Sequence, residues 1–300
     1  MLPYQKAYAL LHIIIGETRR LLFETKYYAE VDVTDNCNLR CKHCYHFGNP
    51  YKTLHPEEVP LETWKERFSG LYHEGVRLMF LIGGEPALRL DVVELAYRTF
   101  PVVHIITNGQ IPIPKKLSRL VIFVSLDGDR MKNDALRGKN TFDKAIRNYS
   151  GDCRVIINMT LLKDNYTDLE FVVKTAKQNA FRGVVCNFYT TSPDYADPLF
   201  IAQKERADII AEVRRVKKIY PSHLLLTKSM IDWYAKPDHR GYCYWGDEAQ
   251  HFDVTWQRRR CFSSPDPWAR AGCANCGCFA GSFQNPLSLL RYFREAYKLA

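Results

Sequence analysis

The sequence EVDVTDNCNLRCKHCY, residues 30–45, joins an alternating stretch of apolar and polar residues to three closely spaced cysteines. Two valines alternate with polar neighbours, which is the period-two pattern of a β-strand. Cys37, Cys41 and Cys44, here called the cysteine triad, follow with three and then two residues between them. The stretch therefore predicts a strand at residues 30–35 that delivers three thiols to a loop at its carboxyl end.

Three thiols on one short loop are typical of an iron–sulfur site, because cysteine thiolates are the usual protein ligands of such clusters. With this spacing the three thiolates can bind three irons of a 4Fe–4S cube, and the fourth iron is left without a cysteine ligand. An open coordination position is what a catalytic metal requires. The alternative is a zinc site made by the triad and His43, although zinc sites more often pair two such knuckles and no second knuckle is adjacent.

Further β-type runs follow the triad and are separated by helical patterns, the first with Leu61, Trp64, Phe68 and Leu71 on one face. The expected strands are residues 77–82, 102–107, 121–126, 155–161 and 184–189. Strands that alternate with helices in this way run parallel, with right-handed crossovers. Six units are too few for the closed eight-unit barrel. The predicted fold class is therefore α/β, a partial (β/α)6 TIM-like barrel with a cysteine-rich C-terminal extension.

The pattern along the chain predicts three parts. They are an N-terminal helical extension at residues 1–29, the partial barrel at residues 30–228, and a cysteine-rich region with a final helix at residues 229–300. The N-terminal part mixes apolar residues with lysine and arginine. We expect it to be a helix packed on the barrel, and a peripheral membrane contact is the alternative.

Composition narrows the class of protein. Hydrophobic residues at 46% and charged residues at 25% are typical of a soluble globular chain. No apolar run reaches the roughly 20 residues that cross a bilayer, and no signal-peptide cleavage site is evident, so a cytoplasmic location is expected. The net charge of +9 favours anionic partners, but no base-stacking motif accompanies it, and no nucleic acid is expected as a partner.

Polar motifs stand at or near the ends of the predicted strands, where barrel enzymes keep their chemistry. Gly83-Gly84-Glu85-Pro86 follows the second strand, and paired glycines let a backbone approach a ligand while an acidic side chain suits an ammonium group. The candidates on the next three strands are Thr107, Asn108, Ser125, Asp127, Asn158 and Thr160. Taken singly, each is as consistent with a turn or a buried polar group as with a ligand site.

Taken together, the triad with Tyr45 directly after it, the GGEP motif and the TNG and SLDG motifs resemble the radical S-adenosylmethionine (SAM) family over about residues 30–190. The resemblance implies that the triad holds a 4Fe–4S cluster whose open iron chelates SAM. It also implies that Tyr45 flanks the adenine, Glu85 the methionine amine and Ser125 the ribose, with the other motif residues completing the SAM site.

The same resemblance implies the reaction class. One electron from the reduced cluster cleaves SAM to methionine and a 5′-deoxyadenosyl radical, while the protein positions the radical and excludes water. The resemblance further implies an electron donor such as flavodoxin or ferredoxin. The expected protein is then an enzyme of transferase or oxidoreductase type.

Five more cysteines crowd the C-terminal region: Cys243, Cys261, Cys273, Cys276 and Cys278. This segment is rich in Cys, Trp, Gly and Pro and has no sustained hydrophobic period. A metal site or another cross-link is therefore needed to stabilise its fold. An auxiliary iron–sulfur cluster is favoured over a structural zinc knuckle, and a cysteine-rich lid without metal is the third interpretation.

The motifs around Tyr242-Cys243-Tyr244-Trp245-Gly246 and Trp256-Gln257-Arg258 are similar to the hopanoid-biosynthesis members of the family, which transfer an adenosyl group to a polycyclic alkene. Those members carry a cysteine where this chain has Ile106. Cys186, on the sixth strand, is a candidate hydrogen-atom donor in its place, and an inert buried cysteine is the alternative. The expected substrate is a hydrophobic small molecule or lipid. A maturase of a peptide or natural product and a non-catalytic zinc or iron–sulfur module are the alternatives.

Overall fold

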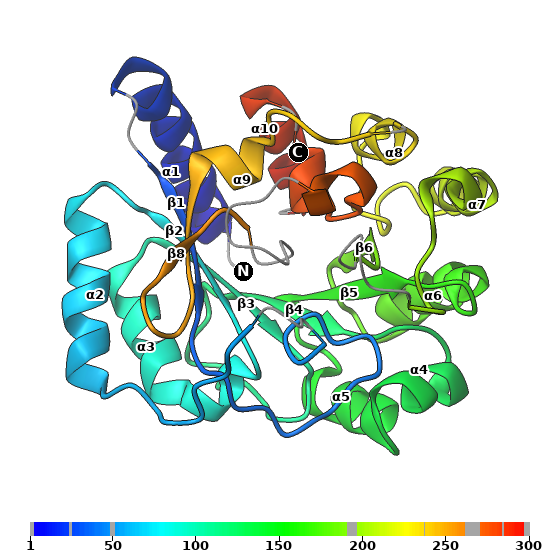
Figure 1. Ribbon diagram of the computed structural model, residues 1–300, viewed down its shortest axis with the longest axis horizontal. Coiled ribbons are helices and arrows are strands. Elements are labelled where there is room, and N and C mark those ends of the chain that lie inside the picture. The colour runs from blue at the N-terminus through cyan, green and yellow to red at the C-terminus, as the bar shows by residue number, and fades with distance from the viewer. Residues whose placement is uncertain are drawn as a thin grey trace.

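The computed structural model describes residues 3–23, 26–48, 52–190, 197–236, 238–261, 271–283 and 285–296. Within these residues the chain is built on one curved eight-stranded sheet in the order β6-β5-β4-β3-β2-β1-β7-β8 (Figure 1). The strands are β1 (Tyr28–Asp32), β2 (Leu78–Ile82), β3 (Val102–Thr107), β4 (Val121–Ser125), β5 (Val155–Leu161), β6 (Gly183–Phe188), β7 (Ala249–Phe252) and β8 (Arg258–Arg259). Strands β1 to β6 are parallel and stand in sequence order, which confirms the predicted partial barrel.

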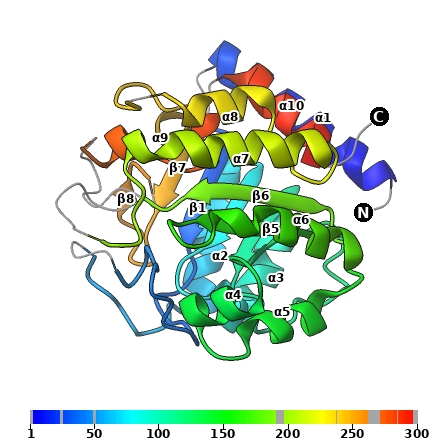
Figure 2. The ribbon, with the colours of Figure 1, turned by 90° about the vertical axis from the view of Figure 1, so that its right-hand side faces the viewer.

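Helices cover the outer face of this sheet, as Figures 1 and 2 show for α2 to α7. The helices are α1 (Pro3–Phe23), α2 (Leu61–His73), α3 (Leu90–Thr99), α4 (Arg130–Arg137), α5 (Thr141–Tyr149), α6 (Leu169–Gln178), α7 (Arg206–Ile219), α8 (Lys228–Tyr234), α9 (Tyr244–Glu248) and α10 (Pro286–Ala296). Short 3₁₀ turns are η1 (Pro86–Arg89), η2 (Tyr166–Asp168), η3 (Gln203–Glu205), η4 (Ala271–Asn275) and η5 (Ala280–Ser282). Helix α2 buries Trp64, Phe68 and Leu71, the face that its sequence period predicts.

Strands β1 to β7 are largely buried, because helices lie outside them and aromatic side chains of the C-terminal segment pack on the inner face. All five residues of β2 are buried, so this strand is a continuous apolar run and does not alternate. The first strand lies at Tyr28–Asp32 and not at the predicted residues 30–35. It starts earlier because Tyr28 pairs with Leu78, and it ends where the chain turns toward the GGEP loop.

The C-terminal region adds to the barrel sheet, which its sequence did not predict. Strand β7 pairs in parallel with β1, and β8 pairs antiparallel with β7. Helix α10, which begins at Pro286 as expected, lies beside α1. The division of the chain into three parts stays a prediction. In the described part of the chain, no helix combines the length and apolar character needed to cross a bilayer.

Candidate active site

A cavity at the carboxyl ends of the barrel strands contains most of the predicted site residues. Its lining includes Cys37, Cys41, Cys44, Tyr45, Gly83, Gly84, Thr107, Asn108, Ser125, Asn158 and Thr160. Four other candidates, Glu85, Pro86, Asp127 and Cys186, are not among the described residues that line it. The fold therefore brings motifs from five strands to one cavity, and some motif residues lie behind the residues that line it.

The sulfur atoms of the triad lie close to hydrogen-bond donors. The backbone N–H of Leu39 donates to the first sulfur at 3.4 Å, and that of Phe47 donates to the third at 3.4 Å. The Arg137 guanidinium lies 4.0 Å from the second. Burial raises the pKa of the Cys37 thiol to about 11 and also raises that of Cys41, while the Leu39 N–H and Arg137 oppose these shifts and favour thiolate, the form in which cysteine binds a metal. The residues present therefore fit a bound iron–sulfur cluster.

The geometry does not favour a zinc site made by the triad and His43. Zinc at about 2.3 Å from each sulfur of a tetrahedron places the sulfur atoms about 3.8 Å apart. The three triad sulfurs do not all lie within 4.8 Å of one another, since in the described part of the chain that spacing is met by a different group. His43 turns its Nε2 to Asp127 Oδ2 at 2.9 Å.

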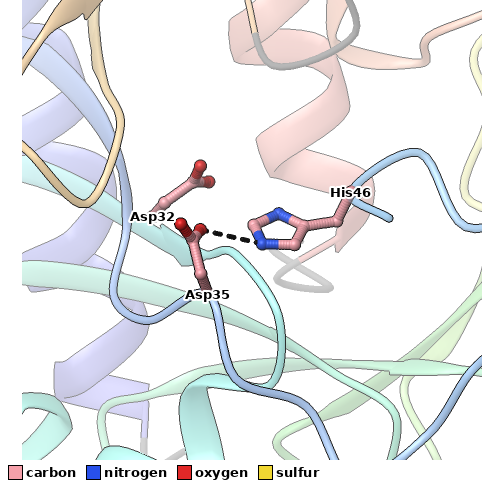
Figure 3. Close-up of side chains that lie close together, drawn as sticks. All are labelled: Asp32, Asp35 and His46. Atoms are coloured by element: carbon pink, nitrogen blue, oxygen red, sulfur yellow. Dashed lines mark ion pairs between the residues drawn. The ribbon is translucent and has the colours of Figure 1, made fainter. Parts of the chain in front are cut away.

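Figure 3 shows the group that does meet this spacing: Asp32, Asp35 and His46. The Lys52 ammonium already lies among them, 2.7 Å from Asp32 Oδ2, 3.1 Å from Asp35 Oδ1 and 3.0 Å from His46 Nδ1. The Arg259 guanidinium adds two contacts of 2.8 Å to the Asp32 carboxylate. The negative charge is thus neutralised by side chains, and the cluster ties β1 and the cysteine loop to β8.

Glu85, expected beside the methionine amine of SAM, is buried next to β3. Its carboxylate accepts hydrogen bonds from Thr107 Oγ1 at 2.7 Å, the Asn108 backbone N–H at 2.7 Å and the Ala87 backbone N–H at 2.9 Å. Burial raises its pKa above the ordinary value, although these three donors oppose that shift. Glu85 therefore holds the TNG loop in position from behind the cavity wall.

The paired glycines let two backbones pack against each other. Gly83 has a φ of +123°, and a Cβ there would lie 2.6 Å from the Thr34 carbonyl oxygen. A Cβ on Gly84 would lie 2.2 Å from the Asn36 carbonyl oxygen. The Gly84 N–H donates to the Thr34 carbonyl at 2.7 Å. The glycines thus fix the GGEP loop against the chain that leads into the triad, a use that the motif alone did not predict.

Asp127 makes several polar contacts behind the cavity lining, near Cys41. It is fully buried and accepts from Arg137 Nε at 2.6 Å and from the Thr160 backbone N–H at 2.7 Å. Burial alone would raise its pKa, but Arg137 and His43 outweigh that effect and hold the pKa of the carboxyl well below its usual range. Through Arg137, the negative charge of Asp127 holds a cation beside the triad.

Cys186 is buried on β6, and burial raises the pKa of its thiol to about 12. Cys186 is not among the described residues that line the cavity, although Asn187 and Phe188 directly after it do line it. The Cys186 carbonyl accepts from the Tyr234 hydroxyl at 2.7 Å. This position does not support Cys186 as a hydrogen-atom donor.

The C-terminal segment contributes Trp245 and Cys278, which the sequence analysis had singled out, and Phe279 and Ala280, which it missed, to the cavity lining. Glu30 of β1 also lines the cavity, and Trp245 Nε1 donates to its carboxylate at 3.4 Å. A signal for Glu30 was present, because it is one of two acidic residues, with Asp32, on a strand that is buried along its whole length. Phe279 and Ala280 had no comparable signal in the sequence.

Two buried or half-buried arginines face the C-terminal cysteines. Arg206, 1% exposed, donates to the carbonyls of Asn275 at 2.6 Å and Cys276 at 2.9 Å. Arg260 Nη1 lies 3.1 Å from Cys273 Sγ. Arg260 also forms an ion pair with Asp247 at 3.1 Å, so the positive charge beside Cys273 is balanced by a carboxylate of the chain.

Neighbouring thiols contribute to the pKa values of the C-terminal cysteines. The pKa of the Cys276 thiol is raised to about 12, mainly by burial and in part by Cys243 and Cys273. Burial also holds the pKa of Cys278 well above its usual value, with further contributions from Cys276 and Cys261. The five C-terminal cysteines thus lie in one region, but among the described residues no three of their sulfur atoms lie within 4.8 Å of one another, and an auxiliary metal site stays a prediction.

Comparison with known proteins agrees with this geometry. The family model of the radical SAM superfamily matches residues 31–176, from β1 to α6. This match, which covers 146 of the 300 residues, supports membership of the radical SAM superfamily for that part of the chain. This family implies a 4Fe–4S cluster and SAM as cofactors, and it makes the protein an enzyme.

Among curated proteins, Fe-coproporphyrin III synthase of Methanosarcina barkeri is 32% identical over 46% of this chain and 38% of its own length. The sporulation killing factor maturation protein SkfB of Bacillus subtilis is 29% identical over 48% of this chain and 38% of its own. The chain thus spans less than half the length of these relatives. The crystal structure of Streptococcus suis SuiB bound to S-adenosylmethionine, 16% identical, covers 81% of this chain and 63% of that one with a TM-score of 0.62.

Proposed function

We propose that this radical SAM enzyme reductively cleaves SAM and uses the resulting radical to modify a hydrophobic small molecule or lipid-like substrate. The observation that carries the proposal is that the cysteine triad opens into the same cavity as the polar strand ends and a set of apolar side chains. The apolar lining residues include Leu39, Phe80, Ile82, Ile106, Phe188 and Phe279.

In this proposal the triad holds the cluster, and SAM lies along the strand ends. When bound, the cluster supplies the electron that cleaves SAM to methionine and a 5′-deoxyadenosyl radical. Tyr45, Gly83 and Gly84 border the SAM site on one side, and Ser125 borders it on the other. Arg137 balances the charge of the thiolates, and the apolar walls exclude water, which protects a reactive species from side reactions.

Two features favour a hydrophobic substrate. The lining on the C-terminal side is aromatic or aliphatic, so it offers a substrate more apolar contact than hydrogen bonding. The C-terminal motifs also resemble the hopanoid enzymes, although Ile106 lines the cavity where those enzymes carry a cysteine. We therefore propose a related hydrophobic substrate and a different final step, with an electron donor such as flavodoxin or ferredoxin.

A peptide or natural-product maturase with an auxiliary cluster is the second candidate. It is supported by the gathered C-terminal thiols with Arg206 and Arg260 beside them. SkfB is, by its name, a maturation protein. In this version Cys243, Cys273 and Cys276 are the central ligands, and Cys261 and Cys278 complete the set.

Anaerobic reconstitution tests the first proposal. With SAM and dithionite, the wild-type protein should show iron–sulfur absorbance and release 5′-deoxyadenosine. The variant with Cys37→Ala, Cys41→Ala and Cys44→Ala should produce none, because the ligands of the catalytic iron are gone. Cys153→Ala is the matched control, since Cys153 is exposed on the surface and is not among the cavity residues. Product formation by the triple variant would contradict the assignment.

Iron content tests the auxiliary site separately. If both sites bind 4Fe–4S clusters, the combined Cys243→Ala, Cys273→Ala and Cys276→Ala variant should fall from about eight to about four irons per chain. It should keep its ability to cleave SAM without substrate. Four irons in both proteins, or zinc in the wild type, would remove the auxiliary cluster and leave the triad proposal intact. Mass spectrometry of co-purified molecules after turnover then distinguishes a lipid product from a peptide product.

A further inference from the structure

Helix α1 turns apolar side chains toward solvent. The exposed ones are Tyr8, Leu11, Ile14, Ile15, Leu21, Leu22 and Phe23, with exposed fractions from 40% to 68%. Residues 8, 11, 15 and 22 follow the spacing of one helix face, and Ile14 and Leu21 extend that face on one side. Single exposed apolar residues are common on proteins, but a contiguous helical face of this kind marks an interaction surface.

The side of α1 that faces the protein is unusually polar for a buried face. Glu17, 4% exposed, accepts hydrogen bonds from the hydroxyls of Tyr28 and Tyr244. Arg20 lies 3.1 Å from Glu17 and 3.3 Å from Glu248. An amphipathic helix normally packs its apolar face on the core. Here polar contacts hold the helix in place, and its apolar face remains available.

Close backbone packing also fixes the orientation of α1. A Cβ at Gly16 would lie 2.2 Å from the Tyr27 ring, so only glycine lets the helix come this close. Ile13, on the same side, is fully buried. The helix therefore cannot roll to hide its apolar face without losing the Glu17 contacts and the Gly16 packing.

Positive charge borders the apolar face. Arg19 on α1 is exposed, and a groove beside Tyr8 is lined by Tyr72, Arg98 and Arg119. Arg98 is paired with Glu94 at 3.7 Å, whereas Arg119 donates to the backbone carbonyls of Tyr97 and Pro101, and no carboxylate of a described residue lies within 4.0 Å of the Arg119 guanidinium. Helix α1 has no acidic residue in its first turn, and its Glu17 points inward. The border of the face is therefore cationic.

We propose that the outer face of α1 binds the surface of an anionic lipid bilayer, with its leucines, isoleucines and terminal aromatic side chain entering the headgroup region. The charge complementarity favours this occupant over a second copy of the chain, because two copies would bring the same cations together. Arginine near an anionic membrane strengthens binding, and each contribution weakens with salt. This proposal does not rest on the proposed reaction.

Vesicle sedimentation of the full chain tests the proposal. Wild-type protein should sediment with phosphatidylcholine vesicles that contain phosphatidylserine, and binding should fall with added salt and without phosphatidylserine. Leu11→Gln, Ile15→Gln and Leu22→Gln together should weaken binding by about tenfold or more, because their contact with the lipid is lost. The control variant combines Leu88→Gln, Met131→Gln and Leu287→Gln, three exposed apolar residues outside α1, and should bind like the wild type.

Other outcomes overturn the proposal. Absence of wild-type binding, or equal binding by the α1 variant and the control, removes the membrane role. A wild-type dimer in light scattering that the α1 variant converts to monomer, without vesicle binding, would assign the face to a second copy. Thermal melting confirms that the variants are folded. SAM cleavage is measured in parallel, so failure of this proposal stays distinct from failure of the proposed reaction.

Discussion

Gly84 and Gly70 occupy opposite environments in this chain. A Cβ at Gly84 would lie 2.2 Å from the Asn36 carbonyl oxygen, whereas a Cβ at Gly70, exposed on α2, meets no atom within 4 Å. Gly84→Ala should therefore lower the free energy of unfolding by about 1–3 kcal/mol, the usual cost of overpacking. Gly70→Ala should raise it by up to about 1 kcal/mol, because alanine favours a helix interior. Denaturant unfolding of both variants measures the contrast, and equal effects would contradict it.

At this scale the sequence identified residues more reliably than roles. The triad and most polar strand ends were placed near one another by the rule that parallel strands end at one edge. Glu85 and Asp127 were also found, but their contacts were not foreseen. A motif states which side chains are present, whereas only the three-dimensional packing decides whether a carboxylate faces a ligand or a neighbouring loop.

Strand β3 carries an ionisable group in an aromatic environment. His104 is 1% exposed and lies near the rings of Phe80, Phe123 and Phe293. Burial, with a smaller contribution from Arg182, lowers its pKa to about 3.

This histidine should make stability depend on pH. The unfolded chain takes up a proton as pH falls below about 6.5, while the folded chain does so only near pH 3, so stability is full above pH 6.5 and falls below it. Between pH 7 and pH 5 the wild type should lose about 2 kcal/mol more than His104→Leu, which carries no titrating group there. Denaturant unfolding at both pH values measures the difference. Parallel losses in the two proteins would show that His104 is not responsible.

The predicted elements agree with the structure where a segment's own sequence has a clear hydrophobic pattern. Strands β2 to β6 are runs of five to seven residues rich in Val, Ile and Leu, and each lies within a residue or two of its predicted position. Strand β7, Ala249–Phe252, has four residues and no such pattern. It is a strand because its backbone pairs with β1, a contact made by the fold as a whole.

At the scale of the whole molecule, the Asp32–Arg259 ion pair connects the first strand to the last. Asp32 is fully buried, and although burial raises its pKa, Arg259 and Lys52 hold the pKa well below the usual range. Arg259→Ala should cost about 3 kcal/mol, because it leaves a buried carboxylate with fewer partners. Arg240→Ala, which breaks the exposed Arg240–Asp238 pair, should leave the melting temperature unchanged. If the two variants have the same melting temperature, the Asp32–Arg259 pair does not stabilise the attachment of β8 to the rest of the sheet.

The pairing of Tyr28 with Ala249 joins residues that are 221 positions apart. During synthesis on the ribosome, one edge of β1 therefore stays unpaired until β7 and most of the polypeptide have emerged. A nascent chain that stalls before this point presents unsatisfied amide and carbonyl groups, a template for association with other unfinished chains. Chaperone demand should consequently be highest late in translation.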